Sequence, residues 1–415
     1  MVNLNKYILS NSTFTIFSFV IRFLFQIYIA NNYPKNDLSM YFAVLDSVMI
    51  IVFIFSGFKD QTIRILAGKD LFTFKQISIA YFCLLLFILM VVFAGGSKTT
   101  NYLKISTFDF SMMILIACIS QFIVIVVNGI KLFMNLTTYE FVKTNLFVIS
   151  FFLLSLFFFE KSVFIILVYS FILSNLFQIS INLFFIIKKI KTIKTKRILT
   201  HSKSIKNISI SSMEYFSAAI PMYFSSVLAS NIFGNHLAGD FIVVGKPLFL
   251  ALITIASYPI FRFFFPYFLT LNTDKKLDVF QKKRKMIVKL VLVIFVIYAT
   301  VFFFFGEQVL KILFTDNYSG AYYHLIILSG ALPFIIITSY YFAFLKSINY
   351  FTSTLKIRII GSIIFISSFF VLVNIYFAPI VLSISISLSS MGMLLSSHLY
   401  FNKNIIEYLK SNKIC

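Results

Sequence analysis

Long apolar stretches recur from one end of the chain to the other, and they constrain the fold more than any other feature. About 20 consecutive apolar residues in a helix are enough to cross the hydrocarbon core of a bilayer. The connections between the stretches are short, and only 12% of the 415 residues are charged while 60% are hydrophobic. The sequence therefore predicts an all-α polytopic membrane protein rather than a set of soluble domains.

The apolar stretches predict twelve transmembrane helices. We expect them at residues 8–30, 39–58, 74–94, 109–131, 141–159, 162–187, 208–232, 240–265, 286–305, 321–343, 358–376 and 379–400. The first stretch has no charged segment before it beyond Lys6 and no small-residue cleavage site after it. We therefore expect it to be the first span rather than a signal peptide.

The distribution of basic residues predicts the orientation of the spans. With the N-terminus inside, 27 Lys and Arg fall on the cytoplasmic side and five fall on the opposite side. Cytoplasmic loops carry an excess of Lys and Arg, so both termini are expected to be cytoplasmic. The net charge of +22 then follows from topology and from contact with anionic lipid headgroups, with no need for nucleic acid.

A weak internal repeat divides the chain in half. Residues 29–47, IANNYPKNDLSMYFAVLDS, align without gaps to residues 228–246, LASNIFGNHLAGDFIVVGK, with six identities. This offset superposes spans 1 and 2 on spans 7 and 8. We expect an N-terminal six-helix bundle (1–187), a basic cytoplasmic linker (188–207) and a C-terminal six-helix bundle (208–415), with the two bundles parallel. That architecture occurs in secondary transporters, whose substrate lies between the halves.

Polar residues follow single faces of several predicted spans. Span 1 carries Asn11, Thr15, Ser18, Arg22 and Gln26 at helical spacing, span 4 carries Gln121, Asn128 and Lys131, and span 6 carries Ser170, Ser174, Gln178 and Asn182. A polar face within a membrane must meet another polar face or water. These faces are predicted either to line a cavity or to form ordinary interhelical hydrogen bonds.

The ionisable residues within the spans are mostly cations. Arg22, Lys246 and Arg262 stand against Asp46, with Glu214 and Asp240 near span ends. Such an excess suits an anionic ligand, and the planar donor fork of arginine fits phosphate well. The alternatives are a structural ion pair, for instance between Asp46 and Lys246, and snorkelling of Arg262 to the headgroups.

No constellation of side chains predicts catalysis or metal binding. Cys83, Cys118 and Cys415 lie far apart, and the four histidines are equally scattered. We find no nucleophile, paired carboxylates or metal-ligand spacing in the loops. The chain is therefore not expected to be an enzyme or to hold a cofactor.

Two segments carry a resemblance to a known family. The first is FGEQVLKILFTDNYSGAYYHLIILSGALPF (305–334), where Gly306, Glu307, Phe314, Tyr318 and Ala321 match its pattern and Thr315-Asp316 replace a common Gly. The second is GDFIVVGKPLFLALITIASYPIF (239–261), through Gly239, Gly245 and Pro259. With its twelve spans in two halves, the whole chain resembles Wzx-type O-antigen flippases. These form part of the polysaccharide-transporter branch of the multidrug/oligosaccharidyl-lipid/polysaccharide (MOP) superfamily.

The resemblance implies a MATE-like fold with a V-shaped central cavity in the bacterial inner membrane. It implies transfer of an undecaprenyl-pyrophosphate-linked oligosaccharide, the lipopolysaccharide O-antigen unit, from the inner to the outer leaflet by alternating access. Arg22 matches a basic position on the first span of related members. On this basis Arg22, Lys246 and Arg262 are expected to bind pyrophosphate, and Asp46 or Glu214 to couple a proton or sodium ion. The sugars are expected against Ser18, Gln26, Gln121, Asn128, Ser174 and Gln178.

Three alternatives remain open. One is an exporter of another lipid-linked polysaccharide precursor, which would differ from an O-antigen flippase only in the sugar that it carries. A multidrug exporter of the same fold would more naturally carry carboxylates in its spans. An O-antigen polymerase typically carries a long external loop with functional Arg and His, whereas the longest one here, about 94–109, holds only Lys98 and Lys104. A polymerase of the same pathway is a candidate partner.

Overall fold

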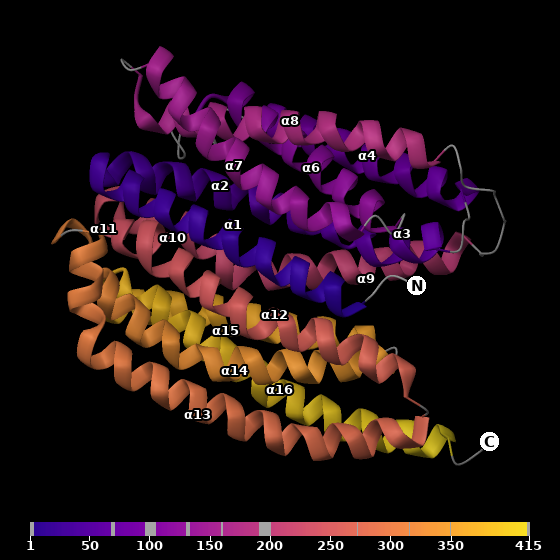
Figure 1. Cartoon of the computed structure of the whole chain (residues 1–415). Coiled ribbons are helices and arrows are strands. Elements are labelled where there is room, and N and C mark those ends of the chain that lie inside the picture. The colour runs from indigo at the N-terminus through magenta and orange to yellow at the C-terminus, as the bar shows by residue number, and fades with distance from the viewer. Residues whose placement is uncertain are drawn as a thin grey trace. The chain divides into compact units, whose positions relative to one another are not determined.

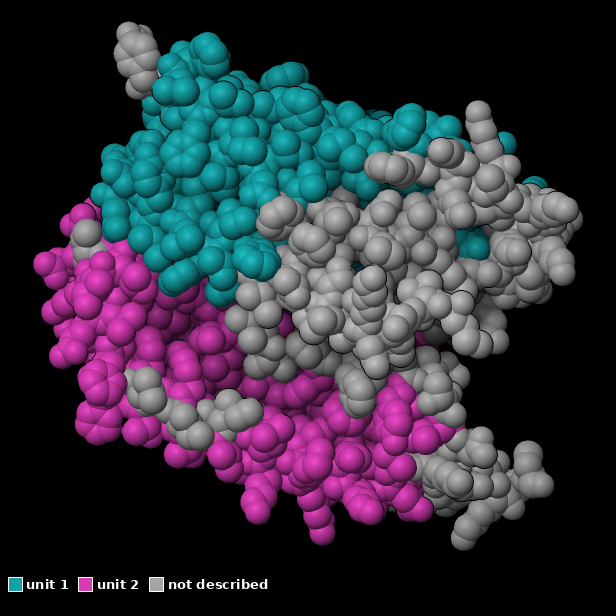
Figure 2. Space-filling model, viewed as in Figure 1, with its two compact units in different colours: residues 1–216 teal, residues 217–415 magenta. Residues whose placement is uncertain are grey.

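The chain is built from helices (Figure 1). The computed structural model describes residues 4–67, 71–95, 105–129, 133–158, 161–190, 201–271, 273–314, 316–348 and 350–412. The described residues divide into two compact units, Met1–Phe216 and Ser217–Cys415, coloured separately in Figure 2.

Unit 1 is formed by helices from the first half of the chain. They are α1 (Leu4–Asn32), α2 (Lys35–Ser56), α3 (Phe58–Ala67), α4 (Leu71–Ala94), α6 (Thr107–Gly129), α7 (Phe133–Phe157), α8 (Val163–Ile190) and most of α9 (His201–Ala219).

Unit 2 holds the remaining helices, among them two π-helical turns, η1 and η2. They are η1 (Ile220–Phe224), α10 (Ser225–Phe233), α11 (Asn235–Gly239), η2 (Asp240–Gly245), α12 (Lys246–Thr270), α13 (Thr273–Phe314), η3 (Asp316–Tyr318), α14 (Ala321–Ser347), α15 (Phe351–Ile375) and α16 (Ile380–Asn412).

The helices confirm the predicted class of fold. Each of the twelve predicted ranges falls on a helix or on consecutive helical segments. Among the described residues, nine helices are long and apolar enough to cross a membrane, and a bent pair within α13 would make ten. The chain is therefore an all-α, multi-pass membrane protein.

The division between the units falls inside a helical stretch. The boundary between the two compact units falls between Phe216 and Ser217, near the end of α9, and the predicted linker at 188–207 stays a prediction. Before the boundary, α9 packs closely within unit 1, since a Cβ atom at Gly57 would overlap the backbone and hydroxyl group of Ser212. A few residues later, the main-chain oxygen of Ser217 accepts a 2.7 Å hydrogen bond from Ser362 Oγ on α15 of unit 2.

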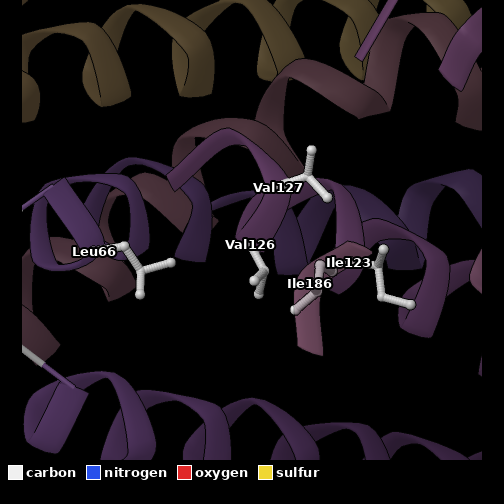
Figure 3. Packing of buried hydrophobic residues seen from close by; sticks show 5 residues of the cluster. All are labelled: Leu66, Ile123, Val126, Val127 and Ile186. Atoms are coloured by element: carbon white, nitrogen blue, oxygen red, sulfur yellow. The ribbon is translucent and has the colours of Figure 1, made fainter. Parts of the chain in front are cut away.

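The interior of unit 1 is organised around α6. In its most apolar 18-residue window, 67% of α6 is buried, compared with 17% for α4. A buried cluster joins Leu66 of α3 to Ile123, Val126 and Val127 of α6 and Ile186 of α8 (Figure 3). Helix α3 was not expected from the sequence, because its ten residues are too few to span a membrane.

The interior of unit 2 is organised around α14. This helix packs against α12, α13, α15 and α16, and 72% of its most apolar window is buried, compared with 28% for α15. Helix α13 is longer than the predicted span 286–305. Its charged start continues the helix beyond the stretch that hydropathy detects. A helix that contacts four neighbours fixes the positions of the side chains described next.

Candidate functional site

Lys246 is a buried cation in the interior of unit 2. Its side chain is 1% exposed, and its Nζ atom donates a 2.7 Å hydrogen bond to Ser226 Oγ of α10. The same ammonium group lies 5.4 Å from the centroid of the Tyr223 ring in η1. Burial of an ammonium group is costly, so intramembrane cations usually mark ion or substrate pathways. Lys246 is therefore the strongest site candidate in unit 2.

The local sequence explains how Lys246 reaches this position. It is the first residue of α12, directly after the π-helical turn η2, and Pro247 follows it. Gly245 lets α14 approach closely, since a Cβ atom there would lie 3.0 Å from His324 Cβ and 3.2 Å from the Asp240 carbonyl oxygen. Single π turns within helices often occur at functional sites. The sequence motif that contains Gly239 and Gly245 thus places a lysine against a neighbouring helix.

His324 stabilises the same region from α14. Its side chain is buried, and Nδ1 lies 2.8 Å from Ser383 Oγ of α16. Its ring centroid lies 5.3 Å from that of Phe241 in η2. His324 therefore connects η2, α14 and α16 beside the residue that precedes Lys246. Sequence reasoning missed both His324 and Ser226, because their partners lie 59 and 20 residues away in the chain.

In unit 1, Arg22 and Asp46 lie near the same tyrosine. Arg22 is exposed on α1, while Tyr41 and Asp46 are buried on α2. Arg22 and Asp46 both lie within electrostatic range of the Tyr41 hydroxyl group. Ser18 is buried one turn before Arg22, and Gln26 is partly buried one turn after it. The structure thus brings a predicted phosphate ligand and a predicted coupling carboxylate to one region of unit 1.

The polar faces of α6 and α8 meet in the interior of unit 1. Ser120 Oγ donates to Gln178 Oε1 at 2.9 Å, and Gln121 Nε2 donates to Ser56 Oγ of α2 at 3.2 Å. Ser174 donates to the main-chain oxygen of Phe171 in its own helix at 3.0 Å. These contacts are the interhelical and local hydrogen bonds that the sequence left open as an alternative to a sugar-binding face.

Two buried amide atoms of α8 have no hydrogen-bond partner among the described residues. They are Gln178 Nε2 and Asn175 Oδ1, one donor and one acceptor, a single turn apart. Asn175 is fully buried and was missed by sequence reasoning, although its spacing of three to Gln178 and seven to Asn182 follows a helix face. Buried amides normally find partners, so this pair marks a polar point in the interior of unit 1.

The remaining predicted site residues lie elsewhere. Glu214 is buried on α9 of unit 1. Asn128 and Arg262 belong to α6 and α12, but their side chains lie outside the described residues. Within the part of the chain that the structure describes, no group of three or more His, Cys, Asp or Glu residues could hold a metal ion.

The fold is that of transporters of the MOP superfamily, as comparison with solved structures shows. One similar structure is an inward-facing multidrug resistance MATE family transporter of that superfamily, with a TM-score of 0.70 and 13% identity, over 95% of this chain and 96% of that one. No protein-family profile and no curated protein matches the sequence.

Two further structures have the same fold. The lipid II flippase MurJ in an inward closed conformation matches with a TM-score of 0.70 and 15% identity, over 96% of this chain and 89% of that one. A MOP superfamily transporter from Pyrococcus furiosus, described as having a binding pocket of reverse polarity, matches with a TM-score of 0.69 and 13% identity, over 98% and 95%.

Proposed function

We propose that this protein is a flippase that moves an undecaprenyl-pyrophosphate-linked oligosaccharide, such as an O-antigen unit, from the inner to the outer leaflet of the bacterial cytoplasmic membrane. The observation that carries this proposal is the ammonium group of Lys246, which is buried in the interior of a membrane-spanning unit. A buried cation favours an anionic ligand, and the pyrophosphate group supplies that charge.

Arg22 of unit 1 is a second candidate contact for an anionic group. Arg22 is exposed on the polar face of an otherwise apolar helix, where a bidentate contact to phosphate would offset the cost of the charge. In this proposal Lys246 exchanges the Ser226 hydroxyl group for a phosphate oxygen during transport. Neither residue performs covalent chemistry, in keeping with a transporter rather than a polymerase.

The likeness to other transporters supports a lipid-linked cargo but not its sugar. MurJ is described as a lipid II flippase, and this chain has its fold over 96% of its length. A multidrug exporter is the alternative, since a MATE transporter has the same fold. The cationic interior of unit 2 argues for the anionic cargo. An exporter of another lipid-linked precursor differs from our proposal only in the glycan.

Unit 1 offers the carboxylates for ion coupling. Asp46 and Glu214 are both buried there, on α2 and α9. A buried carboxylate that takes up a proton or sodium ion loses the cost of its charge, so its occupancy can be linked to conformation. We propose that one of the two couples a proton or sodium ion to transport. Both termini are proposed to be cytoplasmic, and a polymerase of the pathway to be a partner.

The experiment is surface display of the lipid-linked glycan in a strain that lacks this protein. The strain is complemented with wild type, Lys246→Gln, Arg22→Ala or Arg22→Lys, and the amount of each variant in the membrane is measured. Lys289→Gln on α13 is the matched control, because Lys289 is an exposed cation of unit 2. We expect loss of display for Lys246→Gln and Arg22→Ala, partial rescue by Arg22→Lys, and normal display for the control.

Other outcomes separate the alternatives. Normal display with Lys246→Gln and Arg22→Ala at wild-type protein levels would remove both residues from the site. If deletion leaves display intact but shortens the glycan chains, the protein acts as a polymerase and the flippase proposal fails. Increased sensitivity of the deletion strain to cationic drugs, with glycan display unchanged, would identify a multidrug exporter.

A further inference from the structure

A second group of cations lies in unit 2 at the junction where α14 ends and α15 begins. Lys346 is in the last turn of α14 and is only 7% exposed. Arg358 is in the second turn of α15 and is partly buried. Neither residue belongs to the candidate site around Lys246, and the predicted orientation places this end of unit 2 at the cytoplasmic surface.

One aromatic and aliphatic cluster supports both cations. Arg358 Cζ lies 4.6 Å from the centroid of the Phe342 ring, and Lys346 Nζ lies 5.8 Å from that of Phe261. Phe342 belongs to a buried cluster with Leu345, Ile357 and Met393, and Phe261 packs against it. Arg358 NH1 also lies 3.6 Å from Met393 Sδ. The two rings and the sulfur atom, from α14, α12 and α16, hold the two cations in place.

A third cation joins this end of the unit through Tyr341, the residue before Phe342. Arg284 NH1 of α13 donates a 3.2 Å hydrogen bond to the Tyr341 hydroxyl oxygen. That hydroxyl group also lies 3.1 Å from His398 Nδ1 of α16. The ring centroids of Phe280 and Phe401, 4.4 Å apart, confirm that α13 and α16 meet here. Arg284, Lys346 and Arg358 thus belong to one end of the bundle, on three different helices.

The charge of this end is strongly positive. Among the described side chains of residues 277–285 and 346–358, the cations are Lys282, Lys283, Arg284, Lys285, Lys346, Lys356 and Arg358, and the acid is Asp278. Exposed lysines alone would satisfy the topology rule. Lys346 and Arg358 differ from them because they are withdrawn from the surface onto a packed cluster. Held in place by this packing, the two cations offer fixed positive charge to an anion at this end of the unit.

We propose that this end of unit 2 binds a phosphate group, held by Lys346 and Arg358 with Arg284 adding to the positive field. Arginine offers phosphate a planar pair of donors and lysine offers a point charge. The phosphate can be the headgroup of an anionic membrane lipid or a free phosphate in solution. The proposal does not depend on the transported substrate, since it rests on residues outside the Lys246 site.

The test uses the full-length protein in nanodiscs and separates the two sources of phosphate. One arm compares discs of phosphatidylcholine with discs that also contain phosphatidylglycerol, and the other adds inorganic phosphate to phosphatidylcholine discs. Native mass spectrometry measures retained phosphatidylglycerol, and the midpoint of thermal unfolding reports ligand binding in both arms. Wild type, Lys346→Gln, Arg358→Gln and Lys346→Arg are compared with the control Lys356→Gln, an exposed lysine of the same helix as Arg358.

We expect wild type and Lys356→Gln to be stabilised alike, by lipid or by phosphate. Binding should weaken by about tenfold or more in Lys346→Gln and Arg358→Gln, as for loss of one charge-assisted hydrogen bond, and should be largely retained in Lys346→Arg. Stabilisation by phosphatidylglycerol assigns the site to lipid, and stabilisation by inorganic phosphate alone assigns it to the soluble anion. Equal stabilisation of all variants, or loss in Lys356→Gln as well, overturns the proposal.

If the Lys346→Gln variant does not fold, the test rests on Arg358→Gln, because the Arg358 side chain is more exposed than the Lys346 side chain. The unfolding midpoint in pure phosphatidylcholine discs reports folding independently of the anion. A variant with a wild-type midpoint there and no response to either anion supports the site. A variant with a wild-type midpoint and a full response argues against it.

Discussion

Lys246 Nζ and Ser226 Oγ are joined by a 2.7 Å hydrogen bond between two side chains that are almost wholly buried. The bond connects the first turn of α12 to α10, on either side of the turn at Gly234. At this buried position, a substitution can remove the charge of Lys246 and still keep most of the length of its side chain. Substitutions can therefore distinguish a transport role of Lys246 from a structural one.

Replacement of Lys246 by methionine should abolish transport without destabilising the fold. Methionine keeps most of the apolar stem and removes the cost of burying a charge, so the midpoint of thermal unfolding should be unchanged or raised. Glycan display should fall by about tenfold or more, in keeping with the loss of a charged contact. Both are measured at matched protein levels. A fall in the unfolding midpoint together with normal transport would show that the charge is structural.

Ser120→Ala should destabilise unit 1, because Gln178 Oε1 would lose its donor in a buried position. The expected cost is about 1–3 kcal/mol in the free energy of unfolding. Adding Gln178→Leu should recover part of this loss, since both polar partners are then gone, and a double-mutant cycle measures the coupling. Ser180→Ala on the exposed face of α8 should have little effect. Strict additivity of the two buried substitutions would contradict the pairing.

Gly57→Ala should be among the most damaging small substitutions in unit 1. Its new Cβ atom would overlap backbone atoms of Ser212, which cannot move without shifting α9. Overpacking of this kind costs about 1–3 kcal/mol or more. Gly330→Ala in α14 is the control, since nothing lies within 4 Å of its added Cβ atom, and it should be neutral or slightly stabilising. Unfolding midpoints in detergent compare the two; equal midpoints would refute the close approach.

Gly245→Ala should impair both stability and transport. The added methyl group would press on the Cβ atom of His324, displacing η2 and with it Lys246. His324→Ala retains the Cβ atom and should not relieve the clash, whereas His324→Gly should relieve part of it. The three unfolding midpoints and the glycan display of each variant test this. Rescue by His324→Ala would mean that the imidazole ring, not the backbone spacing, sets the contact.

The positions of the spanning helices could be predicted because each needs a run of apolar residues of fixed length. The prediction 109–131, for example, corresponds to α6, Thr107–Gly129, and 358–376 overlaps α15, Phe351–Ile375. Where a helix leaves the bilayer this constraint disappears. Hydropathy accordingly missed the charged first turns of α13 and the short helix α3.

The candidate site was predictable in part. Lys246 and Arg22 stand out because a cation within an apolar stretch is costly, whatever surrounds it. The partners of Lys246 could not be inferred, since Ser226 and Tyr223 reach it only through the packing of η1 and α10 on α12. A polar stripe was also ambiguous: Ser174 shares a face with Gln178, yet its hydroxyl group bonds to its own helix. The spacing of such a stripe predicts the helix face on which each polar side chain lies. The hydrogen-bond partner of that side chain depends on the neighbouring helices.

The two π turns beside Lys246 have a mechanical consequence. Each spaces its backbone hydrogen bonds five residues apart rather than four, and so holds about one residue more than an α turn. Closing such a turn to α geometry swivels the helix beyond it by about 100°, the angle of one residue. Lys246 directly follows η2, and Tyr223 lies within η1. A change of η2 from π to α geometry would therefore rotate Lys246 about the axis of α12 relative to the residues before the turn.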